Sequence, residues 1–292
     1  MKKVLVFGGT RFFGKELVKD LLLIGDDVTI FTRGNVYDEF NDSVKRLKGD
    51  KNSIDDLKNA LEGKEYDVVY DTISYSPSDA KRVIEVLKGK TKKYIVISSA
   101  AVYDKGENLN ERDFNPLKYD IKLGEREEFS YKEGKRLMES YLFKNAPFKV
   151  MAVRFPVVIG KDDYTNRLKT YVENVCDGVE IGTTNIKQKM NIISQGEAGV
   201  FLTWLRDLDI TGPINATCTG DVSLEEILDI IYDETSKDYK ISKEENNKTS
   251  PYNDYLGLTI SNLNIKELGG YFFKNAKGEL VENIKRYAKE KK

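Results

Sequence analysis

The chain has 292 residues, and its 47 lysines and arginines nearly balance its 48 aspartates and glutamates, which leaves a net charge of -1. This balance provides no general attraction to nucleic acid or to an anionic membrane, so neither is predicted as a partner. Histidine is absent, which excludes a Ser-His-Asp triad, a Cys-His pair and nearly every zinc site. No metal site is predicted, and proton transfer is left to Tyr, Lys, Asp or Glu.

Cysteine usage and hydropathy predict the compartment. Cys176 and Cys218 have no CxxC spacing, and we expect both to be buried thiols in a reducing environment. The apolar run after Met-Lys-Lys is too short for a signal peptide, and no other stretch is long enough to span a membrane. These features predict a cytoplasmic protein.

Short apolar runs alternate with helical patterns through the first half of the chain. Continuous apolar stretches predict buried strands at 4–7, 28–31, 68–70, 94–97 and 150–154. Helices are predicted between them: one that ends at Gly25, one from a Ser53 capping box with Asp56 to Gly63, one from Pro77 to Leu87, and one over 128–145. This alternation predicts an α/β fold of the Rossmann type, a doubly wound parallel sheet with helices on both faces.

The alternation of predicted strands and helices stops at residues 102–127, a polar stretch rich in turn residues that we expect to be a functional loop. Beyond Gly160 the pattern loosens, with helices predicted near 165–176, 196–206, 223–235 and 278–290. We expect a dinucleotide-binding core over 1–160, completed by 186–220. The remaining segments, 161–185 and 221–292, are expected to form a smaller α/β substrate-binding lobe.

A glycine-rich turn, FGGTRFFG, connects the first strand to the first helix. Glycines let the backbone approach a pyrophosphate, and the helix N-terminus offers N–H groups and a positive dipole end. We therefore predict that residues 8–14 bind a dinucleotide, through Gly8, Gly9, Thr10, Arg11, Phe12, Phe13 and Gly14; the alternative is a plain tight turn. A glycine usually stands where this chain has Arg11, whose side chain is expected beside a phosphate.

The end of the second strand bears on the choice between NAD and NADP. An NAD site usually places an acid here to accept the ribose hydroxyls, whereas this chain has Arg33. Arg33 and Arg11 together suit a 2′-phosphate, so NADP is predicted in preference to NAD; the alternative is that Arg33 is merely solvated. Asp50, after the third apolar run, is expected to meet the adenine edge.

Tyr131 and Lys135 are spaced i, i+4 on one face of a predicted helix. A nearby ammonium favours the phenolate, so Tyr131 could take a hydroxyl proton while hydride leaves for a nicotinamide. Ser99 could hold the oxygen of the same substrate hydroxyl by a hydrogen bond. Tyr239/Lys243 and Tyr287/Lys291 share the spacing, but only the Tyr131 helix follows the fifth strand and so faces the expected cofactor crevice.

Four motifs in order resemble the NAD-dependent epimerase/dehydratase family, in the extended or atypical branch of the short-chain dehydrogenase/reductase superfamily. They are Gly8 to Gly14, Ser98-Ser99-Ala100-Ala101-Val102-Tyr103, Tyr131 to Lys135, and Arg154-Phe155-Pro156-Val157-Val158-Ile159-Gly160. The resemblance implies a Rossmann core with a C-terminal substrate lobe, and Ser99, Tyr131 and Lys135 as the catalytic set. It also implies that Lys135 bonds the nicotinamide ribose and that the protein is a homodimer.

The chain departs from the family pattern at two places. Dehydratases of the family carry an Asp-Glu pair where Ala100 and Ala101 stand, and nucleotide-sugar enzymes usually have an asparagine near Val157. We predict an NAD(P)-dependent epimerase or reductase that acts on a secondary alcohol or carbonyl of a small molecule, such as a sugar or nucleotide-sugar derivative. Because GGTRFFG also resembles chloroplast RNA-binding relatives, the alternative is a catalytically altered protein that senses the cofactor or binds RNA.

Overall fold

The computed structural model describes residues 1–291, which divide into two compact units. The core unit comprises Met1–Tyr103, Glu111–Phe155 and Ala198–Ala216, and the second unit comprises Asp104–Asn110, Pro156–Glu197 and the residues from Thr217 onward. Several segments that we expected in the core group with the second unit instead, namely 104–110, 156–160, 186–197 and 217–220. Residue 292, included in the predicted lobe, lies outside the described residues.

The core unit is built on a seven-stranded sheet with the order β12-β7-β5-β4-β1-β2-β3. All its neighbouring strands are parallel, which confirms the predicted Rossmann-type fold. Its strands are β1 Lys3–Phe7, β2 Asp27–Thr32, β3 Lys45–Lys48, β4 Val68–Asp71, β5 Lys93–Ser99, β7 Lys149–Phe155 and β12 Gly212–Asn215. At the two edges lie β3, with the sequence KRLK, and β12, which contains Pro213.

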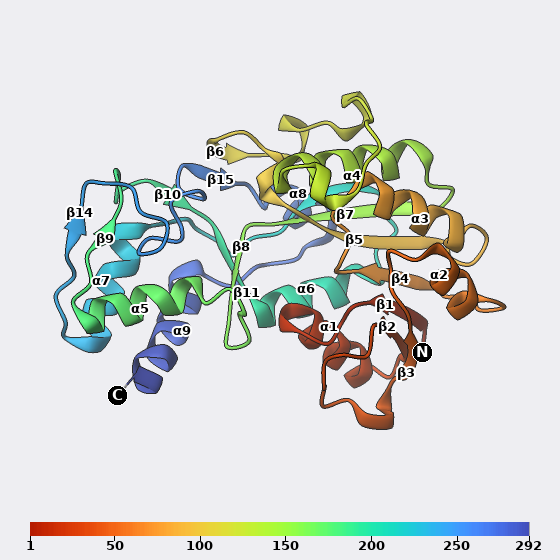
Figure 1. Cartoon of the computed structure of the whole chain (residues 1–292), viewed down its shortest axis with the longest axis horizontal. Helices are drawn as coiled ribbons and strands as arrows, with labels where there is room; N and C mark the ends of the chain where they lie inside the picture. Colours follow the sequence, from red (N-terminus) through yellow and green to blue (C-terminus); the bar gives the residue numbers. More distant parts are fainter. Residues whose placement is uncertain (292) are drawn as a thin grey trace. The chain divides into compact units, whose positions relative to one another are not determined.

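Helices cover both faces of this sheet, with α3 and α4 on one side and α1 and α6 on the other (Figure 1). The five helices are α1 Phe12–Leu23, α2 Ile54–Leu61, α3 Pro77–Leu87, α4 Tyr131–Asn145 and α6 Gln195–Leu205. Leu57, Val83 and Met138 of α2, α3 and α4 pack in one cluster with Val69 and Val96 of the sheet, all fully buried. These three helices therefore cover the face of the sheet onto which Val69 and Val96 point.

Serine side chains start three of these helices. Ser53 accepts from the Asp56 N–H at 3.2 Å, but the Asp56 carboxylate accepts from the Asp50 N–H, so the predicted capping box is only half formed. A complete capping box between Ser76 and Asp79 precedes α3. Helix α4 begins at Tyr131, later than predicted, because Ser130 caps it and residues 126–128 form a separate 3-10 turn.

The second unit contains a four-stranded sheet, β13-β10-β15-β6, and two strand pairs, β11-β8 and β14-β9. Its strands are β6 Gly106–Leu109, β8 Val157–Ile159, β9 Ile181–Gly182, β10 Lys189–Met190, β11 Ile192–Ser194, β13 Val222–Ser223, β14 Ile241–Ser242 and β15 Leu258–Ile260. Its further helices are α5 Arg167–Asp177, α7 Leu224–Thr235, α8 Leu263–Gly269 and α9 Ala276–Lys291. β6 lies within the predicted 102–127 loop, and α8 was not predicted. In residues 1–291, no helix is both long and apolar enough to cross a membrane.

Candidate active site

The glycine turn between β1 and α1 has the backbone that only glycine adopts easily. Gly8 has φ of +91° and Gly9 has φ of +86°. A Cβ on Gly8 would lie 2.4 Å from Thr72 Oγ1, and one on Gly9 would lie 2.9 Å from Val18 Cγ2. A Cβ on Gly14 would lie 3.3 Å from the Gly9 Cα. These glycines therefore let the turn pack closely against Thr72 and Val18 while it connects β1 to the N-terminus of α1, the place where a dinucleotide-binding fold holds a pyrophosphate.

Arg11 does not need the conformational freedom of the glycine that usually stands there. It is the N-cap of α1 with extended backbone, φ of -138° and ψ of 151°, and the following residue, Phe12, carries the positive φ of 51°. The Arg11 side chain makes no capping hydrogen bond, and the first turn of α1 holds no acid. The positive end of the helix dipole therefore meets no carboxylate from its own first turn, which fits an anionic group of a dinucleotide.

Arg33 directly follows β2, and Gly8 donates to the carbonyl of Phe31 on the same strand at 3.0 Å, so the glycine turn and the β2 end are neighbours. The side chains of Arg33 and Arg11 are exposed. Asp50 follows β3, where one carboxylate oxygen accepts from the Asn52 N–H at 2.9 Å and the other is left for a further donor.

Lys135 is buried, with 2% of its surface exposed, on the inner face of α4. Its ammonium donates to the carbonyl of Ser74 at 2.6 Å and to the carbonyl of Ile97 at 2.7 Å. Two of its three N–H groups are therefore used, and the Tyr75 ring faces the ammonium at 4.3 Å from its centroid. Burial lowers the pKa of Lys135 to about 7.

Tyr131 lies close to this ammonium, and Ser99 ends the strand that supplies one of its two carbonyl acceptors. Ser99 ends β5, two residues after the Ile97 carbonyl, and its oxygen accepts from the Ala101 N–H at 3.1 Å, which leaves the hydroxyl hydrogen to donate. Tyr131 is the first residue of α4, half exposed, and its ring centroid is 5.9 Å from Lys135 Nζ. The structure thus places Tyr131 beside Lys135, and places Ser99 two residues along β5 from a carbonyl that Lys135 bonds.

The other two tyrosine–lysine pairs of the same spacing lie in the second unit. Tyr239 donates to the Asp229 carboxylate at 2.9 Å, and Tyr287 donates to the Gly160 carbonyl at 2.6 Å. Each phenol therefore already has a structural acceptor.

Comparison with known proteins agrees with this geometry. A family model described as NAD(P)H-binding matches residues 8–181, which is more than half of the chain. The chain belongs to this NAD(P)H-binding family. The match confirms the nicotinamide-binding family that the sequence resemblance predicted, and a nicotinamide dinucleotide is the cofactor class of the fold.

Two solved structures share the fold of this NAD(P)H-binding protein. UDP-glucose 4-epimerase from Thermus thermophilus, in complex with NAD, has a TM-score of 0.75 and 15% identity, with 98% of each chain covered. UDP-glucuronic acid 4-epimerase from Bacillus cereus, in complex with UDP-glucuronic acid and NAD, has a TM-score of 0.75 and 16% identity, with 99% of each chain covered. The fold is therefore that of the NAD-dependent epimerases and dehydratases.

One curated relative is similar in sequence. The chloroplast stem-loop binding protein of 41 kDa b from Arabidopsis thaliana is 36% identical over 121 residues, which are 37% of this chain and 32% of the relative. The match thus spans about a third of the length of that relative.

Sequence reasoning did not predict the buried ion pair beneath the site. Arg154 on β7 and Glu139 on α4 are both fully buried, with Arg154 Nη2 2.6 Å from Glu139 Oε2. All five guanidinium N–H donors are used, because Arg154 also bonds Glu139 Oε1, the Tyr103 hydroxyl and the carbonyls of Glu111 and Phe114. Glu139 lies one helical turn after Lys135, a spacing that could have signalled a second inward polar residue.

Gly134 is a second residue that the sequence did not single out. A Cβ at this position would lie 2.5 Å from the carbonyl oxygen of Tyr75, so only glycine lets α4 approach the 72–76 segment this closely. That approach is what brings Lys135 Nζ to the Ser74 carbonyl.

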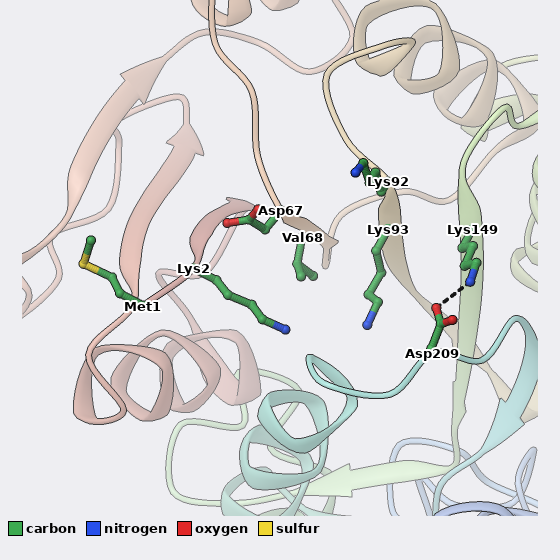
Figure 2. A pocket seen from close by; sticks show the side chains of 8 residues that line it. All are labelled: Met1, Lys2, Asp67, Val68, Lys92, Lys93, Lys149 and Asp209. Atoms are coloured by element: carbon green, nitrogen blue, oxygen red, sulfur yellow. Dashed lines mark hydrogen bonds and ion pairs between the residues drawn. The ribbon is translucent and has the colours of Figure 1, made fainter.

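The NAD(P)H-binding protein also has a cavity of about 430 Å³ at the amino ends of the strands, the edge opposite the glycine turn. Figure 2 shows Lys2 and Lys93 extending toward a common space and Lys149 paired with Asp209. Lys93 donates to the Arg206 carbonyl at 2.7 Å, and Lys149 is 2.5 Å from Asp209. Because these lysines neutralise the carbonyl end of α6 and nearby carboxylates, the cavity is explained structurally and is not a candidate active site.

Proposed function

We propose that this protein is an NAD(P)-dependent epimerase or reductase that acts on a secondary alcohol or carbonyl of a small molecule, such as a sugar or nucleotide-sugar derivative. The observation that supports the proposal is the placement of Tyr131 beside Lys135, next to the end of β5 where Ser99 stands, in the same unit as the glycine turn. The nucleotide-sugar epimerases that share the fold support this substrate class.

Each of the three residues has a role that follows from its chemistry. The Lys135 ammonium stabilises a Tyr131 phenolate, which takes the proton from the substrate hydroxyl and returns it in the reverse direction. The Ser99 hydroxyl donates to the same substrate oxygen and fixes its position. A nicotinamide bound at the glycine turn would supply hydride transfer. The remaining N–H of Lys135 would bond the nicotinamide ribose.

Replacing Tyr131 tests this assignment. In the Tyr131→Phe variant we expect turnover to fall by roughly a hundredfold or more, because the acid/base group is lost, with cofactor affinity nearly unchanged. Chromatography of the products from a panel of UDP-sugars measures epimerisation, the change in nicotinamide absorbance measures net oxidation or reduction, and isothermal titration gives the affinity. Tyr239→Phe, from the pair of equal spacing in the second unit, is the control. Full turnover in Tyr131→Phe would refute the proposal.

We further propose that the preferred cofactor is NADP. Arg33 and Arg11 are exposed near the β2 end, where a 2′-phosphate would lie, and Asp50 is left to meet the adenine edge. Isothermal titration should give NADP affinity roughly tenfold above NAD affinity, and Arg33→Ser should remove the difference. Tighter binding of NAD to the unmodified protein would contradict this choice.

A second candidate function is the binding of stem-loop RNA, which is favoured by the partial similarity to the chloroplast stem-loop binding protein. The net charge of -1 supports it poorly, because sequence-independent affinity for RNA comes from basic surface. A mobility-shift titration with a stem-loop RNA at low salt tests it. The absence of a complex there would remove this candidate.

The location and assembly also remain proposals. Cys176 and Cys218 are free thiols, which supports a reducing compartment such as the cytoplasm. Sedimentation equilibrium would test the homodimer that the family resemblance implies.

A further inference from the structure

A buried ion pair lies behind the catalytic lysine. Lys51, between β3 and α2, is 6% exposed, and Asp71, the last residue of β4, is fully buried. Lys51 Nζ is 2.9 Å from Asp71 Oδ2 and also donates to the hydroxyl of Ser74. A pair withdrawn from water in this way is seldom a gain in stability over apolar packing, so its presence in the fold suggests another role.

The Asp71 carboxylate fastens the segment that follows β4. Its Oδ2 atom accepts from the Ser74 hydroxyl at 2.9 Å and the Tyr94 hydroxyl at 2.6 Å, and its Oδ1 atom accepts from the Ile73 N–H at 3.0 Å. Together with the bond from Lys51, these bonds hold the Ser74 hydroxyl and the backbone of the preceding residue, Ile73. The position of the Ser74 carbonyl is thereby fixed.

That carbonyl is one of the two acceptors of the Lys135 ammonium, at 2.6 Å. The link from Lys51 and Asp71 to Lys135 therefore runs through a single residue, Ser74. The pair also acts on Lys135 through its charges, because the Lys51 ammonium disfavours a second ammonium nearby and the Asp71 carboxylate favours it.

We propose that Lys51 and Asp71 are a positioning pair for Lys135, which hold the Ser74 carbonyl in place and set the charge that Lys135 experiences. This inference rests on the proposed function only in assigning Lys135 a part in the reaction. The pair touches neither reacting atoms nor the predicted catalytic hydroxyls.

Several charged groups around Lys135 must be weighed together. They are Lys51 before α2, Asp71 at the end of β4, Asp79 on α3 and Glu139 on α4. The rings of Tyr75 and Tyr131 also face the ammonium, with centroids at 4.3 and 5.9 Å. Burial lowers the pKa of Lys135 to about 7; the three carboxylates act against that shift, and Lys51 adds to it.

The test is an NMR titration of the full-length protein carrying 13C-labelled lysine, with the Lys135 signal assigned by its loss in Lys135→Met. In Lys51→Met the pKa of Lys135 should rise by about one pH unit, and in Asp71→Asn it should fall by a similar amount. Lys51→Arg keeps the charge and should leave the pKa of Lys135 near its original value. General loosening of the site would instead raise the pKa of Lys135 in both Lys51→Met and Asp71→Asn, toward the ordinary lysine value.

Shifts of the same sign in both variants, or no shift in either, would overturn the positioning role. Should Lys51→Met not fold, Asp71→Asn and Lys51→Arg still test the sign, since a rise in Asp71→Asn contradicts the proposal. The titration needs no substrate, so it is independent of turnover. Opposite shifts combined with full activity of Tyr131→Phe would refute the proposed function alone, whereas the reverse pattern would refute the positioning pair alone.

Discussion

The ammonium of Lys135 is buried away from water, so its pKa differs between the folded and the unfolded chain. The unfolded chain holds this proton up to a pKa near 10.5, whereas burial in the folded protein lowers the pKa to about 7. Between these two values the unfolded state binds more protons at this site than the folded state. Raising the pH through this window therefore favours folding.

We expect the free energy of unfolding of the unmodified protein to increase relative to that of Lys135→Met as the pH rises from 7 to about 10. Methionine does not titrate, so the difference between the two proteins isolates Lys135. Urea unfolding at a series of pH values measures it. Lys81→Met, which removes an exposed lysine of α3, should show no such trend; an equal trend in both variants would contradict the burial argument.

Gly9 is the second residue whose environment dictates its identity. Gly9→Ala should destabilise the protein by about 1–3 kcal/mol, because the new Cβ meets Val18 and Val6 and the positive φ is strained. Dinucleotide binding should weaken by roughly tenfold as the turn shifts. Thermal unfolding and isothermal titration measure the two effects.

Gly63→Ala is the matched control for Gly9→Ala. Gly63 has φ of +63° but no atom within 4 Å of the added Cβ, so only conformational strain is introduced. We expect a cost of about 1 kcal/mol and no change in dinucleotide affinity. Equal losses of affinity in the two variants would show that crowding at Gly9 is irrelevant to binding.

Among the elements, α4 is the one that connects the chemistry to the core. Its inner face carries Lys135 toward the carbonyls of Ser74 and Ile97, and one turn later Glu139 toward Arg154 on β7. The Ser98 hydroxyl also donates to Glu139, so the residue before Ser99 is tied to the same carboxylate. The register of α4 against β5 and β7 is thus set by polar contacts as well as by packing.

Breaking this pair from the helix side should be costly. Glu139→Gln leaves the buried Arg154 guanidinium without its counter-charge, and we expect a loss of about 3–5 kcal/mol in the free energy of unfolding, measured by urea denaturation. Glu85→Gln, which breaks the exposed pair of Glu85 with Lys58, should cost far less, because water already screens this pair. Similar costs for the two variants would show that burial of the pair does not matter.

At the scale of the whole molecule, the core unit is assembled from segments that are far apart in sequence. Strand β12 pairs with β7, and the Tyr70 hydroxyl on β4 donates to the Leu202 carbonyl of α6 at 2.8 Å. Phe201, Leu202 and Leu205 are fully buried. One face of the sheet is therefore covered by α1 alone until residues 198–216 are in place.

A fragment of residues 1–160 should accordingly fail to fold on its own. Without α6, the apolar side chains on one face of β4 and β5 meet water at a cost of about 25 cal/mol per Å², and this cost opposes a margin of only about 5–15 kcal/mol for a typical domain. Urea titration followed by circular dichroism should give no cooperative transition for the fragment. The full chain should give one under the same conditions, and a cooperative fragment would contradict the argument.

The parts of the fold that could be predicted from sequence are those with local periodicity. The buried strands and α3 follow from continuous apolar runs and capping residues, and the glycine turn and the Tyr131/Lys135 spacing are local motifs. β6 could not be predicted, because GENL has no apolar pattern and becomes a strand only by pairing with β15. The pairing of Lys51 with Asp71 was missed because nothing near Lys51 in sequence indicates that its side chain is buried.

The edges of the seven-stranded sheet have a consequence for self-association. β3 presents Lys45, Arg46 and Lys48 at one edge, and β12 has Pro213, which lacks an N–H, at the other. Charge repulsion at the first edge and the missing donor at the second both discourage another copy from adding its own strand there. Crowded molecules of this protein should therefore resist stacking into continuous intermolecular sheets, the route by which open parallel sheets aggregate.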